Sequence, residues 1–229
     1  SIAIADEEPG LAVQTINRAL DGLPVALSQY MPDGVYPEGP GYWNYGTSFS
    51  VATAAMLETA FGSDFGITNY PGFISSAMFK VMCTSPSGFY YNFSDCGDKR
   101  GGSGDNILAW FAAKTGNRIY FEKERFLIPP DKITLDRFSG ASLAWMSQYE
   151  EKSNKNLPNV WVGNGTNPIA VFKNDEGDRD YYFAGKGGAG SLSHGNMDAG
   201  SFVFELDGVR WVIDPGVQPY HELEKTGFD

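Results

Sequence analysis

The chain contains little cysteine and little histidine, with two residues of each type among 229. A structural zinc site takes four Cys or His ligands, so Cys83 and Cys96 alone cannot build one. Two alternatives stay open for these cysteines: a disulfide in an oxidising compartment, or two buried thiols.

Long apolar runs and an excess of basic residues are also missing. No run of about eighteen apolar residues occurs, so the sequence predicts no membrane-spanning helix. The 17 Lys and Arg residues are outnumbered by 28 Asp and Glu, which gives a net charge of −11. Because nucleic-acid-binding surfaces carry a basic footprint, we expect no nucleic-acid partner.

Aromatic residues and glycine are abundant. Aromatics make up 14% of the chain, and there are 28 glycines. This composition is typical of proteins that stack on sugars, and equally of a large core with many tight turns. Hydrophobic residues, at 42%, are numerous enough to build a sizeable core and exclude a mainly disordered chain.

Hydrophobic periodicity divides the chain into a helical part and a strand-rich part. Apolar spacings of three and four predict helices over residues 13–30, 49–60, 74–81, 105–115 and 141–149, joined by loops at 31–46, 62–72 and 84–104. After Pro158 the pattern predicts strands near 160–162, 169–172, 181–183, 202–204 and 211–213, with a hairpin turn at Asp207-Gly208. We therefore predict an α+β chain with a helical domain at 1–155 and a β-domain at 156–229.

Three stretches combine chemically active side chains with small residues. Residues 33–46 read D-G-x-Y-x-E-G-x-x-Y-x-x-Y-G, residues 186–202 read K-G-G…S-H-G-x-x-D-A-G-S-F, and residues 208–216 read G-V-R-W-x-x-D-P-G. The glycine-rich second stretch lacks the order of a phosphate-binding loop. Together the three stretches resemble the heparinase II/III-like polysaccharide lyases.

The resemblance covers essentially the whole chain and implies a partial (α/α) toroid followed by part of an antiparallel β-sandwich. It implies cleavage of a uronic-acid-containing polysaccharide by β-elimination, in the periplasm or outside the cell. The first residues, SIAIADEEPG, lack the pattern of a secretory signal, and HELEKTGFD ends without a closing strand. We therefore expect a fragment cut at both ends, without the residues that neutralise the substrate carboxylate and inactive by itself for that reason.

Such a lyase needs a base for the C5 proton and an acid for the departing oxygen. A tyrosine and a histidine can share these roles, since a neighbouring positive charge makes a tyrosine more acidic. By resemblance, Tyr42 and His194 are the catalytic pair, and Tyr45 is the alternative tyrosine. The resemblance implies substrate contacts from Glu38, Trp43, Tyr45 and Lys186, and Arg210 is a further cation that could attract a carboxylate.

One departure from the family concerns a metal. Some members show His-Gly-His, with the second His binding zinc, whereas this chain has Asn196 at that place. Asn is a poor zinc ligand, although Asp214 matches another ligand position. Three alternatives stay open: no metal, a hydrogen-bonded pair of Asn196 and Asp214, or a structural zinc or harder divalent cation.

Two other function classes compete with the lyase. One is a non-catalytic carbohydrate-binding homologue, which Asn196 favours. The other is a glycoside hydrolase on an (α/α) toroid with Glu38 and Asp95 as its carboxylates, which would need a separation of about 5–9 Å. The negative net charge disfavours densely sulfated heparin and favours a less charged acidic polysaccharide as the substrate.

Overall fold

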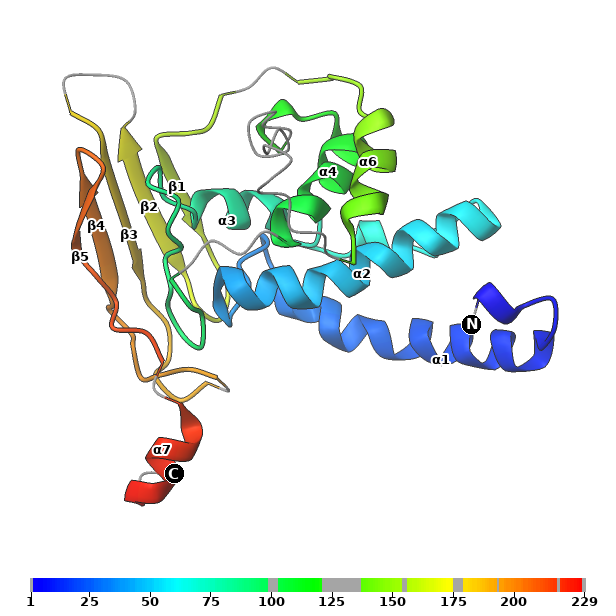
Figure 1. Ribbon diagram of the computed structural model, residues 1–229, viewed down its shortest axis with the longest axis horizontal. Helices are drawn as coiled ribbons and strands as arrows, with labels where there is room; N and C mark the ends of the chain where they lie inside the picture. The colour runs from blue at the N-terminus through cyan, green and yellow to red at the C-terminus, as the bar shows by residue number, and fades with distance from the viewer. Residues whose placement is uncertain are drawn as a thin grey trace.

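The computed structural model describes residues 2–98, 103–120, 137–153, 156–174, 179–192, 194–217 and 219–227. The α-helices are α1 (Pro9–Leu27), α2 (Gly39–Phe61), α3 (Ser76–Met82), α4 (Ser103–Thr115), α6 (Ser139–Ser147) and α7 (Tyr220–Thr226). Short 3-10 turns are η1 (Ile2–Ile4), η2 (Ser28–Tyr30), η3 (Ile67–Asn69) and η4 (Arg118–Tyr120). The strands are β1 (Val160–Gly163), β2 (Ile169–Asn174), β3 (Tyr181–Lys186), β4 (Phe202–Leu206) and β5 (Val209–Val212). The α+β prediction is confirmed: helices come first, then a five-stranded antiparallel sheet in the order β1-β2-β3-β4-β5 (Figure 1).

The predicted helices form close to their expected positions. Pro9 stands in the first turn of α1, where its missing N–H has no partner to lose. Ile16 and Leu20 of the predicted apolar stripe pack against the core, whereas Val13 is exposed. Helix α4 packs against both α2 and α6, and it begins at Ser103, before the predicted N-cap at Asp105. Helix α7 was not predicted.

The N-terminal part of α2 corrects the predicted loop at 31–46. The helix begins at Gly39, with Pro40 in its first turn, so Tyr42 stands on a helix rather than in a loop. The sequence predicts a loop here because glycines are typical of loops, whereas in the structure these glycines allow other residues to pack closely against the helix. A Cβ on Gly41 would lie 3.0 Å from the sulfur of Cys96, and one on Gly46 would lie 2.7 Å from the hydroxyl of Tyr36.

The sheet is an antiparallel meander whose last turn follows the sequence signal. Asp207 and Gly208 have φ angles of 52° and 76°, the left-handed values that a primed two-residue turn needs. Val171, Ala184 and Val203 stand in register across β2, β3 and β4, and all three are buried. This alternation turns one face of the sheet toward the helices.

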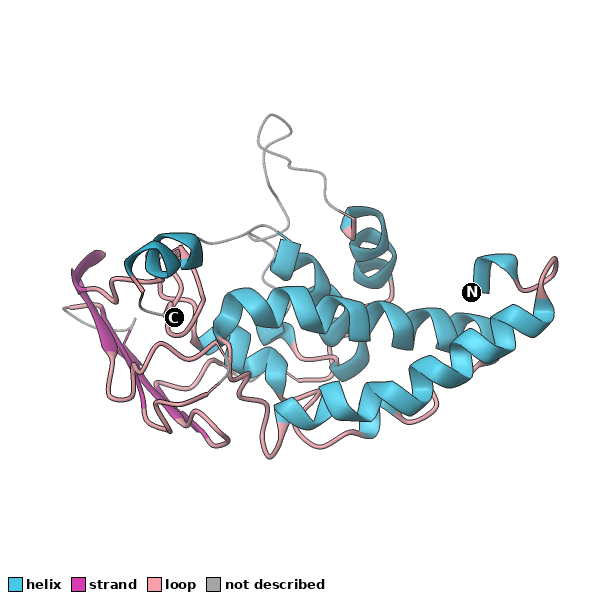
Figure 2. Cartoon of the chain, turned by 90° about the horizontal axis from the view of Figure 1, so that it is seen from below, coloured by secondary structure: helices cyan, strands magenta, loops and turns pink. Residues whose placement is uncertain are grey.

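The helices and the sheet share one hydrophobic core. In Figure 2 the sheet is seen nearly edge-on, with the helices on one side of it. Phe79 of α3 packs against Trp161 of β1, with ring centroids 6.5 Å apart, and the hydroxyl of Tyr182 in β3 donates to the carbonyl of Met82 at 2.8 Å. The helices before residue 155 and the strands after it therefore bury their apolar residues together.

The other face of the sheet is apolar and exposed. It carries Val160, Val162, Phe172, Phe202, Val209 and Trp211 among its exposed side chains.

Cys83 and Cys96 are both buried free thiols. Over the described ranges, no helix combines the length and the apolar character needed to span a membrane.

Candidate active site

Tyr42 and His194 meet where the start of α2 reaches the loop between β3 and β4. The N-terminal end of α2 points toward the sheet (Figure 1), and the rings of Tyr42 and His194 lie 5.7 Å apart between centroids, with a 35° angle between their planes. Tyr42 is half-buried and His194 is exposed. Two groups capable of proton transfer, from the two halves of the chain, thus lie within reach of one small molecule.

The carboxylate of Asp95, whose side chain is buried, contacts the imidazole of His194. Nδ1 of His194 lies 2.7 Å from Oδ2 of Asp95, and the side chains are 41% and 4% exposed, respectively. The hydrogen bond to Asp95 is the largest cause and raises the pKa of His194. Burial lowers the pKa by a smaller amount, and the negative charges of Glu38 and Asp95 raise it further. The imidazolium form of His194 is therefore stabilised by two carboxylates, Asp95 and Glu38.

The loop that carries His194 is bound to the loop that carries Asp95. The backbone N–H of Ser94 donates to Oδ2 of Asp198 at 2.7 Å, and the side-chain amide of Asn196 donates to the carbonyl of Ser94 at 2.7 Å. Asp198 also forms an ion pair with Lys186. These bonds hold the peptide next to Asp95 between two residues that follow His194.

Lys186 and Trp43 lie in places that do not suit their predicted substrate contacts. The side chain of Lys186 is 1% exposed and is paired with Asp198, so it stabilises the loop of His194 and offers no charge to a ligand. Trp43 is 0% exposed and packs against Phe111 in the core, with ring centroids 5.8 Å apart. Because its faces are covered, Trp43 cannot stack on a sugar.

The other predicted contact residues are divided between the site and the surface. Glu38 directly precedes α2 and acts electrostatically on His194. Tyr45 is 59% exposed and packs edge-on against Phe49 instead. Of the two tyrosines considered for catalysis, Tyr42 is the one that contacts the histidine. Arg210 is half-buried, and its Nε lies 2.7 Å from Oε1 of Glu205 in an ion pair.

Asn196 and Asp214, the two residues considered for a metal site, form hydrogen bonds with other groups. The amide of Asn196 donates to Ser94, and Oδ1 of Asp214 accepts the backbone N–H of Gly216 at 2.9 Å. Within the described residues, Asn196 and Asp214 form no hydrogen bond with each other, and no three His, Cys, Asp or Glu side chains gather closely enough to hold a metal ion.

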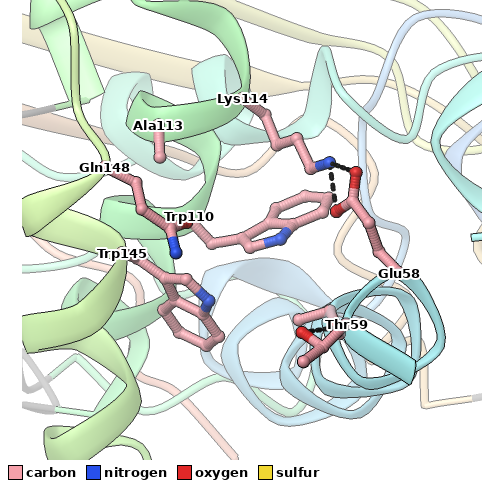
Figure 3. Close-up of a pocket in the computed structure, with 8 residues that line it drawn as sticks. Glu58, Thr59, Trp110, Ala113, Lys114, Trp145 and Gln148 are labelled. Carbon is pink, nitrogen blue, oxygen red and sulfur yellow. Dashed lines mark hydrogen bonds and ion pairs between the residues drawn. The ribbon is translucent and has the colours of Figure 1, made fainter. Parts of the chain in front are cut away.

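A second candidate ligand-binding site is a hollow of about 320 Å³ between α2, α4 and α6 (Figure 3). Trp110 and Trp145 line it, but they are only 2% and 7% exposed, so neither presents a ring face on which a sugar could stack. Among its described lining residues the only charged groups, Glu58 and Lys114, pair with each other. This hollow therefore offers neither a stacking surface nor a free acid–base group.

The chain matches no protein-family model and no curated protein. The site therefore rests on its own geometry. Sequence reasoning had considered Asp95 only as a hydrolase carboxylate and had not connected it with His194. Its place after Tyr90-Tyr91-Asn92-Phe93, a run that the structure buries, indicates that the Asp95 side chain is close to the core but not which residue it contacts.

Proposed function

We propose that this chain is part of a polysaccharide lyase, a carbon–oxygen lyase that cleaves a uronic-acid-containing polysaccharide by β-elimination. The observation that carries the proposal is the 5.7 Å separation between the rings of Tyr42 and His194. Each acid–base contact to substrate spans about 2.6–3.2 Å, so two groups at this spacing can reach one sugar ring and its glycosidic oxygen.

The reaction consumes no water and needs two proton transfers from the protein, together with neutralisation of the substrate carboxylate. A base takes the proton from C5 of the uronate, and the electrons of that C–H bond form the C4–C5 double bond. The C4–O bond breaks, and the departing oxygen takes a proton from an acid. Tyr42 and His194 share these two roles. His194 is suited to donate a proton because Asp95 and Glu38 raise its pKa.

The finer architecture belongs to the same proposal. We infer that the helices are a portion of an (α/α) toroid and that the sheet is one layer of a β-sandwich. Support for the second layer comes from the outer face of the sheet, where six apolar side chains, including Trp211 and Phe172, are exposed. A second sheet packed there would remove this apolar surface from water.

The proposed substrate is an acidic polysaccharide of low charge density, met in the periplasm or outside the cell. The net charge of −11 and the carboxylates at the site disfavour a densely sulfated polymer. Lys186 and Arg210 are both engaged in ion pairs within the protein, with Asp198 and Glu205, respectively. Neutralisation of the uronate carboxylate therefore falls to residues other than these two.

The decisive experiment incubates the full-length protein with a panel of uronate polysaccharides and follows the ultraviolet absorbance of the unsaturated product. Tyr42→Phe should lower turnover by about 10²–10⁴-fold, while the matched Tyr45→Phe should leave it nearly unchanged. New reducing ends without absorbance would assign a glycoside hydrolase. Binding without any product would assign a carbohydrate-binding homologue.

A further inference from the structure

We propose that Asp95 is the positioning residue of the site: it accepts the Nδ1–H of His194 and thereby turns Nε2 toward the substrate as the proton-transfer atom. The reaction that Nε2 serves rests on the proposed lyase function. The orientation and protonation of the imidazole rest only on the contacts around it.

The first argument is the chemistry of the contact. An ionised carboxylate only accepts hydrogen bonds, so the 2.7 Å contact between Asp95 and Nδ1 requires the proton of a neutral ring to sit on Nδ1. Nε2 then carries the free lone pair and can accept a proton. Once it has done so, the imidazolium faces a carboxylate that stabilises its charge.

The second argument is the contrast in exposure between the partners. The Asp95 side chain is 4% exposed, whereas that of His194 is 41% exposed. A carboxylate that is nearly buried cannot itself reach a polymer, but it can fix the ring that does. Asp95 therefore acts through the ring, and the proton exchanged with substrate enters and leaves at Nε2.

The third argument is that the backbone on both sides of the contact is fixed. Ser94, directly before Asp95, is held through its N–H by Asp198 and through its carbonyl by Asn196. His194 itself has a φ angle of 56°, a left-handed conformation that is uncommon among non-glycine residues but that histidine adopts more readily than most. Among the residues that the structure describes, the other titratable groups at the ring are Tyr42, 5.7 Å away between centroids, and Glu38.

The test exploits the two histidines of the chain. Nitrogen-15 NMR of the imidazole rings gives the tautomer and pKa of each, and His221→Gln assigns the pair. We expect the Nδ1–H tautomer for neutral His194 in the wild-type protein. Asp95→Asn should shift the population toward Nε2–H, because an amide can donate to Nδ1, and should lower the pKa of His194 without moving that of His221.

Activity supplies the second readout. With the full-length lyase, Asp95→Asn should lower kcat by about 10²–10⁴-fold with little change in KM, and the pH limb of kcat should move with the pKa of His194. Asp95→Glu, which keeps the charge, should restore part of kcat. Asp98→Asn makes the same chemical change at an exposed position of the same loop and should alter nothing.

Several results would overturn the proposal. An Nε2–H tautomer in the wild-type protein would refute it, and this measurement needs no variant to fold. So would an unchanged pKa of His194 in folded Asp95→Asn, or an unchanged kcat. The expected NMR result without unsaturated product from any uronate polymer would leave the role of Asp95 supported and would count against the lyase function alone.

Discussion

The imidazole of His194 has a carboxylate partner only in the folded protein, and this makes stability depend on pH. Asp95 raises the pKa of His194 in the folded state. The resulting stabilisation is fully present below the unfolded value of about 6.5 and is lost as the pH rises through the folded value. Because the ring is 41% exposed, solvent screens the contact and the effect is small.

The measurement is denaturant unfolding of the wild-type protein and His194→Gln at about pH 5.5 and about pH 8.5, on either side of the transition. The stability difference between the two proteins should be larger at the lower pH. His221→Gln is the control, since His221 is an exposed residue of α7. A larger difference at the higher pH would contradict the ion-pair explanation.

The sequence indicated the positions of some site residues and gave no indication for others. Tyr42 and His194 were indicated by a resemblance to a known family, and the structure places their rings 5.7 Å apart. The burial of Trp43 and Lys186 was not predictable, because a tryptophan in a glycine-rich stretch and a lysine at a strand end are compatible with either surface or core. The contact between Asp95 and His194 joins residues 99 positions apart, and a single sequence carries no signal for it.

At the scale of loops, the ion pair of the buried Lys186 with the half-buried Asp198 holds the segment that carries His194. Burial by itself favours the protonated form of Asp198. Hydrogen bonds from Lys186 and from the Ser94 N–H outweigh it and hold the pKa of Asp198 below its usual 3.8. This stabilisation is present above the unfolded value and is lost as the pH falls through the folded value.

Asp198→Asn should therefore lower the free energy of unfolding by about 3–5 kcal/mol at neutral pH, because it leaves the Lys186 ammonium buried without its counter-charge. The matched change is Glu58→Gln in the solvent-exposed pair with Lys114, which should cost no more than about 1 kcal/mol. Equal losses in urea titrations of the two variants would show that burial of the ion pair does not set its contribution.

Gly72 and Gly208 have similar φ angles, so alanine substitutions at the two positions separate the cost of left-handed backbone strain from the cost of a steric clash. Gly72 and Gly208 have φ angles of 81° and 76°. A Cβ on Gly208 meets no atom within 4 Å, whereas one on Gly72 would lie 1.9 Å from the carbonyl oxygen of Tyr30. Gly208→Ala should cost about 1–2 kcal/mol from left-handed strain alone, and Gly72→Ala should cost more because backbone must also move. Thermal melts of both variants test the order.

Elements were predictable where pattern and turn chemistry agreed. The strands and the Asp207-Gly208 hairpin follow from alternation and from residues that tolerate positive φ. The start of α2 was missed because Gly39, Gly41 and Gly46 suggest a loop. Their role, the close approach of Cys96 and Tyr36, depends on tertiary neighbours that local propensity does not contain.

At the scale of the whole molecule, the shared core predicts that helices and sheet unfold together. Phe79→Ala in α3 should cost about 3–5 kcal/mol, and Ile169→Val in β2 about 0.5–1.5 kcal/mol. Each should lower the midpoint of one common transition, followed by circular dichroism and by tryptophan fluorescence. If the Phe79 variant melted in two steps, the two parts would have separable cores.

The order of helices and strands was predictable, and with it the α+β class. Their union in a single core was not, since apolar periodicity shows which face of an element is buried and not against which partner. Tyr182 illustrates the limit: its place in a strand is clear from sequence, but its hydroxyl bond to Met82 links that strand to a helix far away along the chain.

The two buried thiols provide a kinetic view of this fold. Burial raises the pKa of Cys83 well above its ordinary range and that of Cys96 to about 11, so alkylation by an added reagent must wait for local opening. Cys96 accepts the N–H of Gly41 at 3.1 Å, one residue before Tyr42, whereas Cys83 lies in the shared core. The alkylation rates of Cys96 and Cys83 would therefore measure local opening at the active site separately from opening of the hydrophobic core.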